Sequence, residues 1–561
     1  MDNKPMFNAY PDSIGKNLSD GVAFLSHPEV KGGFSAFYIL PSIFHTDLDR
    51  GFSVIDYSLN KMLVKQEDLE ELREHGILLK LDFILNHASV LSEQFQDILA
   101  KGDASPYRDF FIDWNKFWEG HGTMTDKGYI QPYPELIQDM FFRKPGLPIL
   151  MVRFPDGREV PYWNTFYQKV LYPVLDAQDI MKICKIQYNC AEQLARLVNK
   201  EVQEGKTPEN MTFPAAFEAC KQSVSNYLNA NRKYLGQMDL NLQSPLVWDF
   251  YKNTLEKLAR YGAGIVRLDA FAYAPKTVGK KNFLNEPDTW ELLDKIKEMA
   301  DSFQLKLLPE IHAGYEEKTY ETIAQKGFMT YDFFLPGLII DALESGDGQA
   351  LAKWANEIRE KRIRTVNMLG CHDGIPLLDL KGLLPEERIQ QLIDIVVSRG
   401  GYVKDLHGQK NMYYQVNATY FSALGEDERK LLLARALQLF MPGKPQIWYL
   451  DLLAGTNDYE AVRKAGVGGH KEVNRTNLTR EQAEAALEKE VVKKQLELLK
   501  FRNSFPAFSF TSDMKVEERN ENFTISWKNG KYETELKANL LTYHFDILAK
   551  VNNEIVKQIK D

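Results

Sequence analysis

The sequence predicts an α/β protein built on a (β/α)8 TIM barrel, because eight short apolar runs alternate with helical stretches along most of its length. Such alternation is typical of βα units around a parallel sheet, and eight strands close a barrel. The runs are rich in β-branched and aromatic residues, as strands are. They cover residues 6–10, 36–41, 79–85, 264–269, 306–311, 328–333, 365–370 and 445–450.

The uneven spacing of these runs predicts further modules. Roughly 180 residues separate the third run from the fourth, far more than one helix and two loops require. We therefore expect an enlarged inserted domain over residues 88–240, with helices at 172–204 and 214–230. The barrel takes residues 1–87 and 241–480, and a second long excursion covers 374–425 within it.

The remaining residues, 481–561, predict a linking helix and a small C-terminal antiparallel β domain. Residues 481–503 form a charged amphipathic pattern. Beyond them, FTISWKNGKYETEL and NLLTYHFDIL alternate with period two around an Asn-Gly turn.

Bulk properties exclude several classes of protein. The formal net charge of -9 gives no electrostatic footprint for nucleic acid, and no apolar run approaches the ~18 residues of a membrane span. The start, MDNKPMFNAYPDS, lacks the pattern of a secretory signal. Four cysteines with no CxxC pair and no histidine at ligand spacing argue against disulfides or a zinc site. We expect a cytoplasmic enzyme without a metal and without nucleic-acid or membrane partners.

Three carboxylates follow apolar runs, and together they indicate chemistry on a glycosidic bond. Asp269 ends IVRLD, Glu310 follows LLP, and Asp373 follows NMLGCH. A parallel barrel gathers its chemistry at the carboxyl ends of its strands. Cleavage with retained configuration needs an ionised nucleophile and a protonated acid about 5 Å apart, and a third carboxylate can stabilise the cationic transition state.

Neighbouring residues predict the protonation of this site. Arg267 and Asp269 are two residues apart on a strand, so both point to one face, and the guanidinium favours an ionised Asp269. If Glu310 shares a cleft with two carboxylates, their charge raises its pKa and keeps it protonated. Taken alone, the Arg267–Asp269 motif has the alternative of a structural ion pair. Glu310 alone has the alternative of a solvated loop glutamate.

Two further strand ends carry polar groups. His372 and Asp373 are followed by Gly374, which gives the backbone freedom to aim both side chains into a pocket. Asp82 and Asn86 lie on one face of the third strand, with a histidine just beyond. They either form a buried hydrogen-bond network or contact substrate.

Five segments, LDFILNH, GQMDLN, GIVRLDAFAY, LLPEIH and GCHDG, stand in the order of the signature regions of the alpha-amylase superfamily of retaining glycosidases, which the chain therefore resembles. The resemblance implies a (β/α)8 barrel with an inserted B domain after strand 3 and a C-terminal β domain. It implies that Asp269 is the nucleophile, Glu310 the general acid/base and Asp373 the transition-state stabiliser. The residues implied to hold the glucosyl unit are Arg267, His87 and His372.

Longer stretches, including RLDAFAYAPK, YDFFLPGLIIDAL and GGHKEVNRTNL, resemble the sucrose phosphorylase subfamily. The resemblance implies that Asp49 and Arg475 clamp glucose, that Phe52 stacks on it, and that Tyr273 and Gln415 lie near the sugar sites. It implies reversible phosphorolysis of sucrose to α-D-glucose 1-phosphate and D-fructose through a glucosyl-enzyme. Phosphate is a substrate here, and no cofactor is implied.

An acceptor site that favours millimolar phosphate over roughly 55 M water must offer fixed cations. Candidates are Arg143 and Lys144 on one loop and Lys404, His407 and Lys410 on another, within the excursion at 374–425. Each is otherwise a solvated surface charge.

These two loops also depart from the subfamily pattern. Residues 142–146 read FRKPG where many members have Arg-Pro-Arg-Pro-Gly, and residues 412–415 read MYYQ where many have Asp-Leu-Tyr-Gln. Loss of that aspartate with added cations admits a phosphorylated acceptor. Sucrose phosphorylated on fructose is therefore an alternative substrate, and glucosylglycerate or glucosylglycerol a weaker one. An α-glucosidase, a transglucosidase and a binding subunit without catalysis are further alternatives, and the inserted domain could extend the contact of a homodimer.

Overall fold

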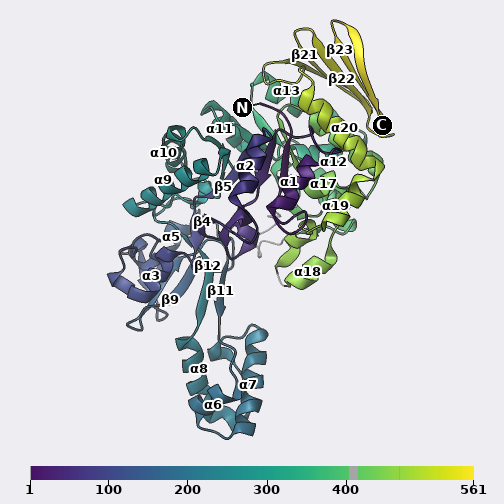
Figure 1. The fold of residues 1–561 in the computed structure, drawn as a ribbon. Coiled ribbons are helices and arrows are strands. Elements are labelled where there is room, and N and C mark those ends of the chain that lie inside the picture. The colour runs from purple at the N-terminus through teal and green to yellow at the C-terminus, as the bar shows by residue number, and fades with distance from the viewer. Residues whose placement is uncertain (1, 404–414, 467) are drawn as a thin grey trace. The chain divides into compact units, whose positions relative to one another are not determined.

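The computed structural model of the chain describes residues 2–403, 415–466 and 468–561 (Figure 1). Its largest sheet has eight strands in the order β14-β13-β5-β2-β1-β19-β16-β15. The paired strands are parallel, and the end strands β14 and β15 also contact each other, so the sheet is a nearly closed barrel. The predicted fold class is confirmed. The strands are β1 (Met6–Ala9), β2 (Ala36–Ile39), β5 (Leu78–Ile84), β13 (Ala263–Asp269), β14 (Lys306–Pro309), β15 (Thr330–Asp332), β16 (Thr365–Asn367) and β19 (Lys444–Trp448).

Amphipathic helices cover the outside of this barrel. In α9, Val247, Leu255 and Leu258 recur at helical spacing and are buried, and Pro245 begins the helix where its missing N–H costs nothing. Helices α9, α10 and α11 contact β13, β14 and β15, the strands that each accompanies. The barrel helices include α1 (Leu18–Ser26), α2 (Gln66–Glu74), α9 (Pro245–Arg260), α10 (Asp288–Ser302), α11 (Thr319–Gln325), α12 (Leu335–Ser345), α13 (Gln349–Glu360) and α16 (Glu428–Phe440).

The barrel interior is polar in the layer below the candidate site. Lys80 is fully buried, and its Nζ donates to the Tyr331 hydroxyl and, over 2.7 Å, to Gln446 Oε1. Its ammonium also lies 3.8 Å from the centroid of the Tyr38 ring. The Tyr38 hydroxyl donates to Asp82 Oδ1 at 3.0 Å. Asp82 therefore belongs to a buried network, one of the two interpretations that its sequence position left open.

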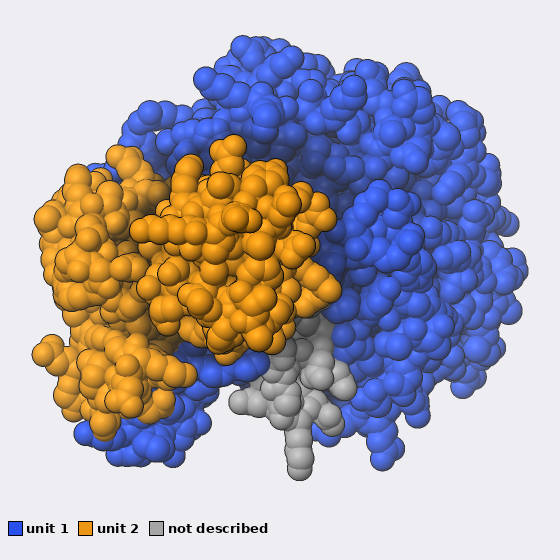
Figure 2. Space-filling view, turned by 90° about the horizontal axis from the view of Figure 1, so that it is seen from below, with its two compact units in different colours: residues 1–87, 132–147, 240–561 blue, residues 88–131, 148–239 orange. Residues whose placement is uncertain are grey.

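The chain separates into two compact units, coloured in Figure 2. Unit 1 holds residues 1–87, 132–147 and 240–561, and unit 2 holds 88–131 and 148–239. Segment 132–147, which lies inside the expected inserted domain, thus groups with the barrel, and it carries Arg143.

Unit 2 contains a hairpin of β9 (Ile149–Arg153) and β10 (Glu159–Trp163), and an antiparallel pair of β11 (Gln168–Leu171) and β12 (Lys233–Asp239). Between β11 and β12 the chain forms a helical lobe with its own apolar core. Helices thus form in both stretches where the sequence predicts them. They are α6 (Ala177–Cys184), α7 (Tyr188–Gln203) and α8 (Lys221–Ala230).

Residues 374–425 contribute α14 (Glu386–Ser398), the short antiparallel pair β17 (Tyr402–Val403) and β18 (Val416–Asn417), and α15 (Tyr420–Ala423) to unit 1. Downstream of the barrel strands, α17 (Tyr449–Leu452) and α18 (Tyr459–Ala465) precede the 3-10 helix η9 (Gly469–Asn474). The C-terminal β domain is a five-stranded antiparallel sheet, as expected. It consists of β20 (Asp513–Arg519), β21 (Asn522–Asn529), β22 (Tyr532–Asn539), β23 (Phe545–Val551) and β24 (Glu554–Lys560).

The single linking helix predicted over 481–503 is wrong. The segment forms two helices, α19 (Arg480–Leu487) and α20 (Glu490–Ser504). Lys489 between them is extended, with φ -66° and ψ 134°, and its ammonium donates to the carbonyls of Leu453 and Ala454. A tertiary contact breaks the helix where no proline or glycine marks a break.

Within the described part of the chain, every helix is too short or too polar to cross a membrane. The four cysteines are free thiols.

Candidate active site

The three carboxylates predicted from strand ends all occur at the C-terminal mouth of the barrel, within unit 1. Asp269 is the last residue of β13, Glu310 directly follows β14, and Asp373 lies in the loop after β16. Each side chain is largely buried, with 12–16% of its surface exposed. Hydrogen bonds from Glu310 N to Leu268 O and from Leu85 N to Asp269 O continue the strand pairing up to the site.

Arg267 joins two of these carboxylates. Its Nη1 lies 2.8 Å from Asp269 Oδ1 and 2.6 Å from Asp82 Oδ1, and its Nη2 lies 2.7 Å from Glu310 Oε1. The guanidinium is buried, so these charge-assisted contacts are poorly screened by water. One rigid fork therefore fixes the relative position of the expected nucleophile and the expected acid.

The pKa directions predicted for this pair are wrong for the ligand-free site. Burial raises the pKa of Asp269 well above its usual value, and Arg267 only partly opposes this. Burial disfavours the ionised form of Glu310 too, but Arg267 and a histidine outweigh it and lower its pKa to about 2. Arg267 divides Nη1 between two aspartates and gives Nη2 to Glu310. In the ligand-free site the pKa of Asp269 shifts upward and that of Glu310 shifts downward.

The histidine beside Glu310 is His312, which the sequence reasoning missed. Its Nε2 lies 3.5 Å from Glu310 Oε1, and its Nδ1 lies 2.9 Å from Asp379 Oδ2. The ring stacks on Phe333 with centroids 3.8 Å apart. Burial disfavours the imidazolium, but Asp379 and Glu310 raise the pKa of His312 to about 9. The signal was available, because His312 follows Glu310 by two residues, the spacing that places side chains on one face of an extended chain.

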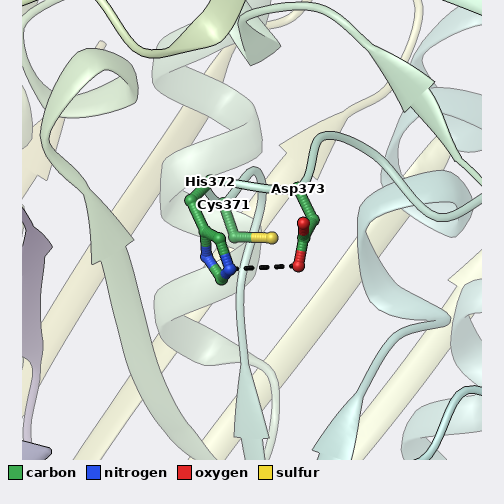
Figure 3. Close-up of side chains that lie close together, drawn as sticks. All are labelled: Cys371, His372 and Asp373. Atoms are coloured by element: carbon green, nitrogen blue, oxygen red, sulfur yellow. Dashed lines mark ion pairs between the residues drawn. The ribbon is translucent and has the colours of Figure 1, made fainter. Parts of the chain in front are cut away.

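Asp373 is held from both sides. Its Oδ2 lies 3.0 Å from His372 Nε2 (Figure 3), and its Oδ1 lies 2.6 Å from Lys471 Nζ. Burial alone would raise the pKa of Asp373, but His372, Lys471 and Arg475 together lower it well below its usual value. Burial also lowers the pKa of His372, so this ring is neutral and its Nε2–H donates to Asp373. Asp373 is therefore an anion at neutral pH.

Cys371, His372 and Asp373 offer three ligand atoms within 4.8 Å of one another, the geometry of a possible metal site (Figure 3). The surrounding charge disfavours one. Lys471 contacts Asp373 Oδ1, and Arg475 Nη2 lies 3.9 Å from the same oxygen. A divalent cation would meet two fixed cations there.

The residues expected to hold glucose gather around Asp373. The Phe52 ring stacks on the His372 ring, with centroids 4.9 Å apart and an interplanar angle of 9°. The backbone carbonyl of Phe52 accepts a hydrogen bond from His87 Nε2 at 2.9 Å. Arg475 Nη1 lies 3.6 Å from Asp49 Oδ1. Asp49 has φ 50°, a left-handed value that is rare outside glycine and concentrates at functional sites.

On the acceptor side the structure gives two contacts that involve expected residues. Arg143 Nη1 donates to the Tyr273 hydroxyl at 2.8 Å, and Gln415 Nε2 lies 3.4 Å from His312 Nε2. Lys144 follows Arg143 in the same loop. Three expected cations lie outside the described residues, and these are Lys404, His407 and Lys410.

With this geometry in place, similarity to known proteins decides the family. No family model matches the chain. The chain is 48% identical to a sucrose 6(F)-phosphate phosphorylase of Ilumatobacter coccineus over 98% of this chain and 96% of that protein. It is 32% identical to the protein of the same name from Thermoanaerobacterium thermosaccharolyticum, over 100% of this chain and 99% of that protein. It is 30% identical to a sucrose phosphorylase of Streptococcus mutans, over 96% of this chain and 97% of that protein. This chain belongs to the sucrose phosphorylase family.

Solved structures agree with this assignment. The crystal structure of a sucrose 6F-phosphate phosphorylase from Thermoanaerobacter thermosaccharolyticum superposes with a TM-score of 0.81 at 30% identity, covering 100% of this chain and 98% of the other. An alpha-amylase from H. orenii shares the fold alone, with a TM-score of 0.58 at 16% identity, covering 97% of this chain and 91% of the other. As a sucrose phosphorylase family member, the protein is a hexosyltransferase.

His312 gives the site a testable pH dependence. The imidazolium lowers the pKa of Glu310, so His312→Gln should raise that pKa and move the acid limb of kcat/KM to higher pH, by about one unit. The limb moves to higher pH because the Glu310 carboxylate is less stable without the neighbouring imidazolium. The pair of Asp269 and Glu310 therefore takes up its second proton at higher pH. A pH profile of phosphorolysis that extends from pH 8 down to about pH 2, where the carboxyl of Glu310 titrates, measures this. The control, His544→Gln, changes an exposed histidine of the C-terminal domain and should leave the profile unchanged. An unmoved limb in His312→Gln would contradict the assignment.

Proposed function

We propose that this enzyme phosphorolyses sucrose 6F-phosphate to α-D-glucose 1-phosphate and fructose 6-phosphate. One observation carries the proposal: identity is 48% to a relative named for this activity, against 30% to one named for plain sucrose. Sucrose itself, the substrate first expected from the sequence, becomes the second candidate, supported by the 30% identity to a relative named for that activity.

The acceptor side supports a phosphorylated leaving group. Arg143 and His312 add two cations near Tyr273 and Gln415, and an arginine fork matches the geometry of a phosphate dianion. Arg143 and Gln415 belong to the two loops that depart from the plain sucrose pattern, 142–146 and 412–415.

The proposed mechanism is a double displacement. Glu310 protonates the glycosidic oxygen while Asp269 attacks the anomeric carbon, so the bond to the fructosyl unit breaks and a β-glucosyl ester forms. Phosphate then loses a proton to Glu310 and attacks the same carbon, which frees Asp269. Two inversions retain the α configuration, and Asp373 stabilises the cationic character of both transition states.

The mechanism needs one proton on the pair of Asp269 and Glu310. The two carboxylates share Arg267 and are coupled, so their macroscopic pKa values belong to the pair and not to either residue. In the reactive complex that proton has to reside on Glu310, with Asp269 ionised. Arg267, which contacts both, can strengthen its contact with Asp269 as Glu310 becomes neutral.

Donor competition tests the proposal. With phosphate present, kcat/KM for sucrose 6F-phosphate should exceed that for sucrose by about 100-fold or more, the effect expected of one or two charge-assisted contacts to the added phosphate. Glucose 1-phosphate should form only when phosphate is supplied. Equal values for the two donors would favour plain sucrose, and glucose release at full rate without phosphate would favour a hydrolase.

Arg143 supplies a matched variant for this comparison. Arg143→Gln should narrow the preference for the phosphorylated donor by about 10-fold or more while kcat for sucrose changes little. Lys281→Gln, an exposed lysine on the loop that also carries Tyr273, should leave both values unchanged. A preference that survives Arg143→Gln would remove Arg143 from the acceptor site.

A further inference from the structure

Lys471 is a charged residue of the site that neither the sequence motifs nor the proposed mechanism uses. It lies on η9, the 3-10 helix over Gly469–Asn474. Its Nζ lies 2.6 Å from Asp373 Oδ1 and 4.0 Å from Asp49 Oδ2. The ammonium therefore stands between the two carboxylates that flank the expected place of the glucosyl ring.

The backbone that carries Lys471 is fixed to the site from two sides. Asn474 Nδ2 donates to Cys371 O at 2.8 Å, and Arg475 Nε donates to His372 O at 2.9 Å. On the other side, Arg50 in the turn that holds Asp49 donates to the carbonyl of Arg475 and to the side chain of Asn477. These contacts tie η9 both to the Asp373 loop and to the Asp49 turn.

The side chain of Lys471 is the adjustable part of this assembly. It keeps 22% of its surface exposed, whereas Arg475 keeps 1%. An ammonium on a four-carbon stem has three rotatable donors, so it can exchange a carboxylate for a hydroxyl acceptor at little cost. In the ligand-free site the ammonium compensates the buried charge of Asp373. It lies 2.6 Å from Asp373 Oδ1, whereas Arg475 Nη2 lies 3.9 Å from the same oxygen.

We propose that Lys471 is a positioning and specificity-determining residue of the donor site, which bridges Asp49 and Asp373 and donates to a glucosyl hydroxyl that enters between them. A sugar hydroxyl there can donate to one carboxylate while it accepts from the ammonium. Lys471 then both orients Asp373 and selects a hydroxyl at one ring position. This role of Lys471 depends on the proposed function in one respect, that the donor carries a glucosyl unit. It does not depend on the leaving group.

The test uses α-D-glucosyl fluoride and its monodeoxy analogues as donors, with phosphate as acceptor. Lys471→Met and Lys471→Gln should each lower kcat/KM for the parent fluoride by about 10- to 100-fold, the value of one charge-assisted hydrogen bond. Lys471→Arg should recover most of the loss. Lys464→Met, which removes an exposed lysine of α18, is the matched control and should behave as the wild type.

The deciding readout is non-additivity between enzyme and donor. In the wild type, removing the hydroxyl that Lys471 contacts should cost about as much as removing the lysine, and in Lys471→Met the same deoxygenation should lower kcat/KM by a factor at least about 3-fold smaller than in the wild type. A lysine with a purely structural role would lower kcat/KM by one common factor for every deoxy donor, and that result overturns the proposal. Because fluoride is the leaving group, a protein that rejects sucrose 6F-phosphate but shows this non-additivity would refute the proposed substrate and leave the role of Lys471 standing.

Discussion

Asp269→Asn should lower glucosyl transfer by roughly 10⁴-fold or more, because it removes the proposed nucleophile and leaves a neutral amide of nearly the same shape. Asp269 is also one of three carboxylates around Arg267, so the change leaves Asp82 and Glu310 to hold the guanidinium and the fold should survive. Initial rates with sucrose 6F-phosphate and with α-D-glucosyl fluoride measure the loss, and thermal unfolding measures the fold.

Asp269→Ala gives this prediction a stereochemical readout. The truncated side chain leaves space on the face from which Asp269 attacks, and azide in that space should restore turnover of α-D-glucosyl fluoride as a single inversion. The product should be β-D-glucosyl azide, identified by NMR. Wild-type enzyme quenched during turnover should carry a glucosyl group on the peptide that contains Asp269. A label on another carboxylate, or an Asp269→Asn variant with more than about 1% of wild-type activity, would contradict the assignment.

The barrel could be predicted from the sequence because parallel strands buried on both faces are short, continuous apolar runs. All eight runs overlap a barrel strand, and the strand within 328–333 covers only Thr330–Asp332. The carboxylates could be placed for the same reason, since a charge directly after such a run must lie at the strand end. The Asn-Gly turn fixed one hairpin of the C-terminal sheet, where Gly530 has φ 59°.

What the sequence could not supply depends on tertiary contacts. The break between α19 and α20 follows from carbonyls of residues 453 and 454, distant in the chain from Lys489. The opposite pKa shifts of Asp269 and Glu310 depend on the contacts of Arg267 with each carboxylate and on the Asp379–His312 pair, whose members are far apart in sequence. Lys471 was overlooked because nothing local connects GGHKEVN to Asp373.

Glu310→Gln should separate the two roles proposed for that residue, acid in the first step and base in the second. With sucrose 6F-phosphate, whose leaving group needs a proton, kcat/KM should fall by about 10³- to 10⁴-fold, the upper range for loss of general acid catalysis. With α-D-glucosyl fluoride, whose leaving group needs none, formation of the glucosyl-enzyme should fall by less than about 10-fold. A burst of fluoride before the steady state measures the first step separately from the second.

Azide distinguishes this variant from the Asp269 series. In Glu310→Ala the glucosyl ester on Asp269 still forms from the fluoride, but phosphate has lost the base that deprotonates it. Azide needs no base, so it should accelerate turnover and give α-D-glucosyl azide, with the configuration opposite to that of the Asp269→Ala product. Because His312 and Arg267 both contact Glu310, the alanine variant also leaves two cations facing the vacated space, which should concentrate the anion there. A β-configured product from Glu310→Ala, or equal losses on the fluoride and the sucrose donor, would show that Glu310 is not the acid and base of this site.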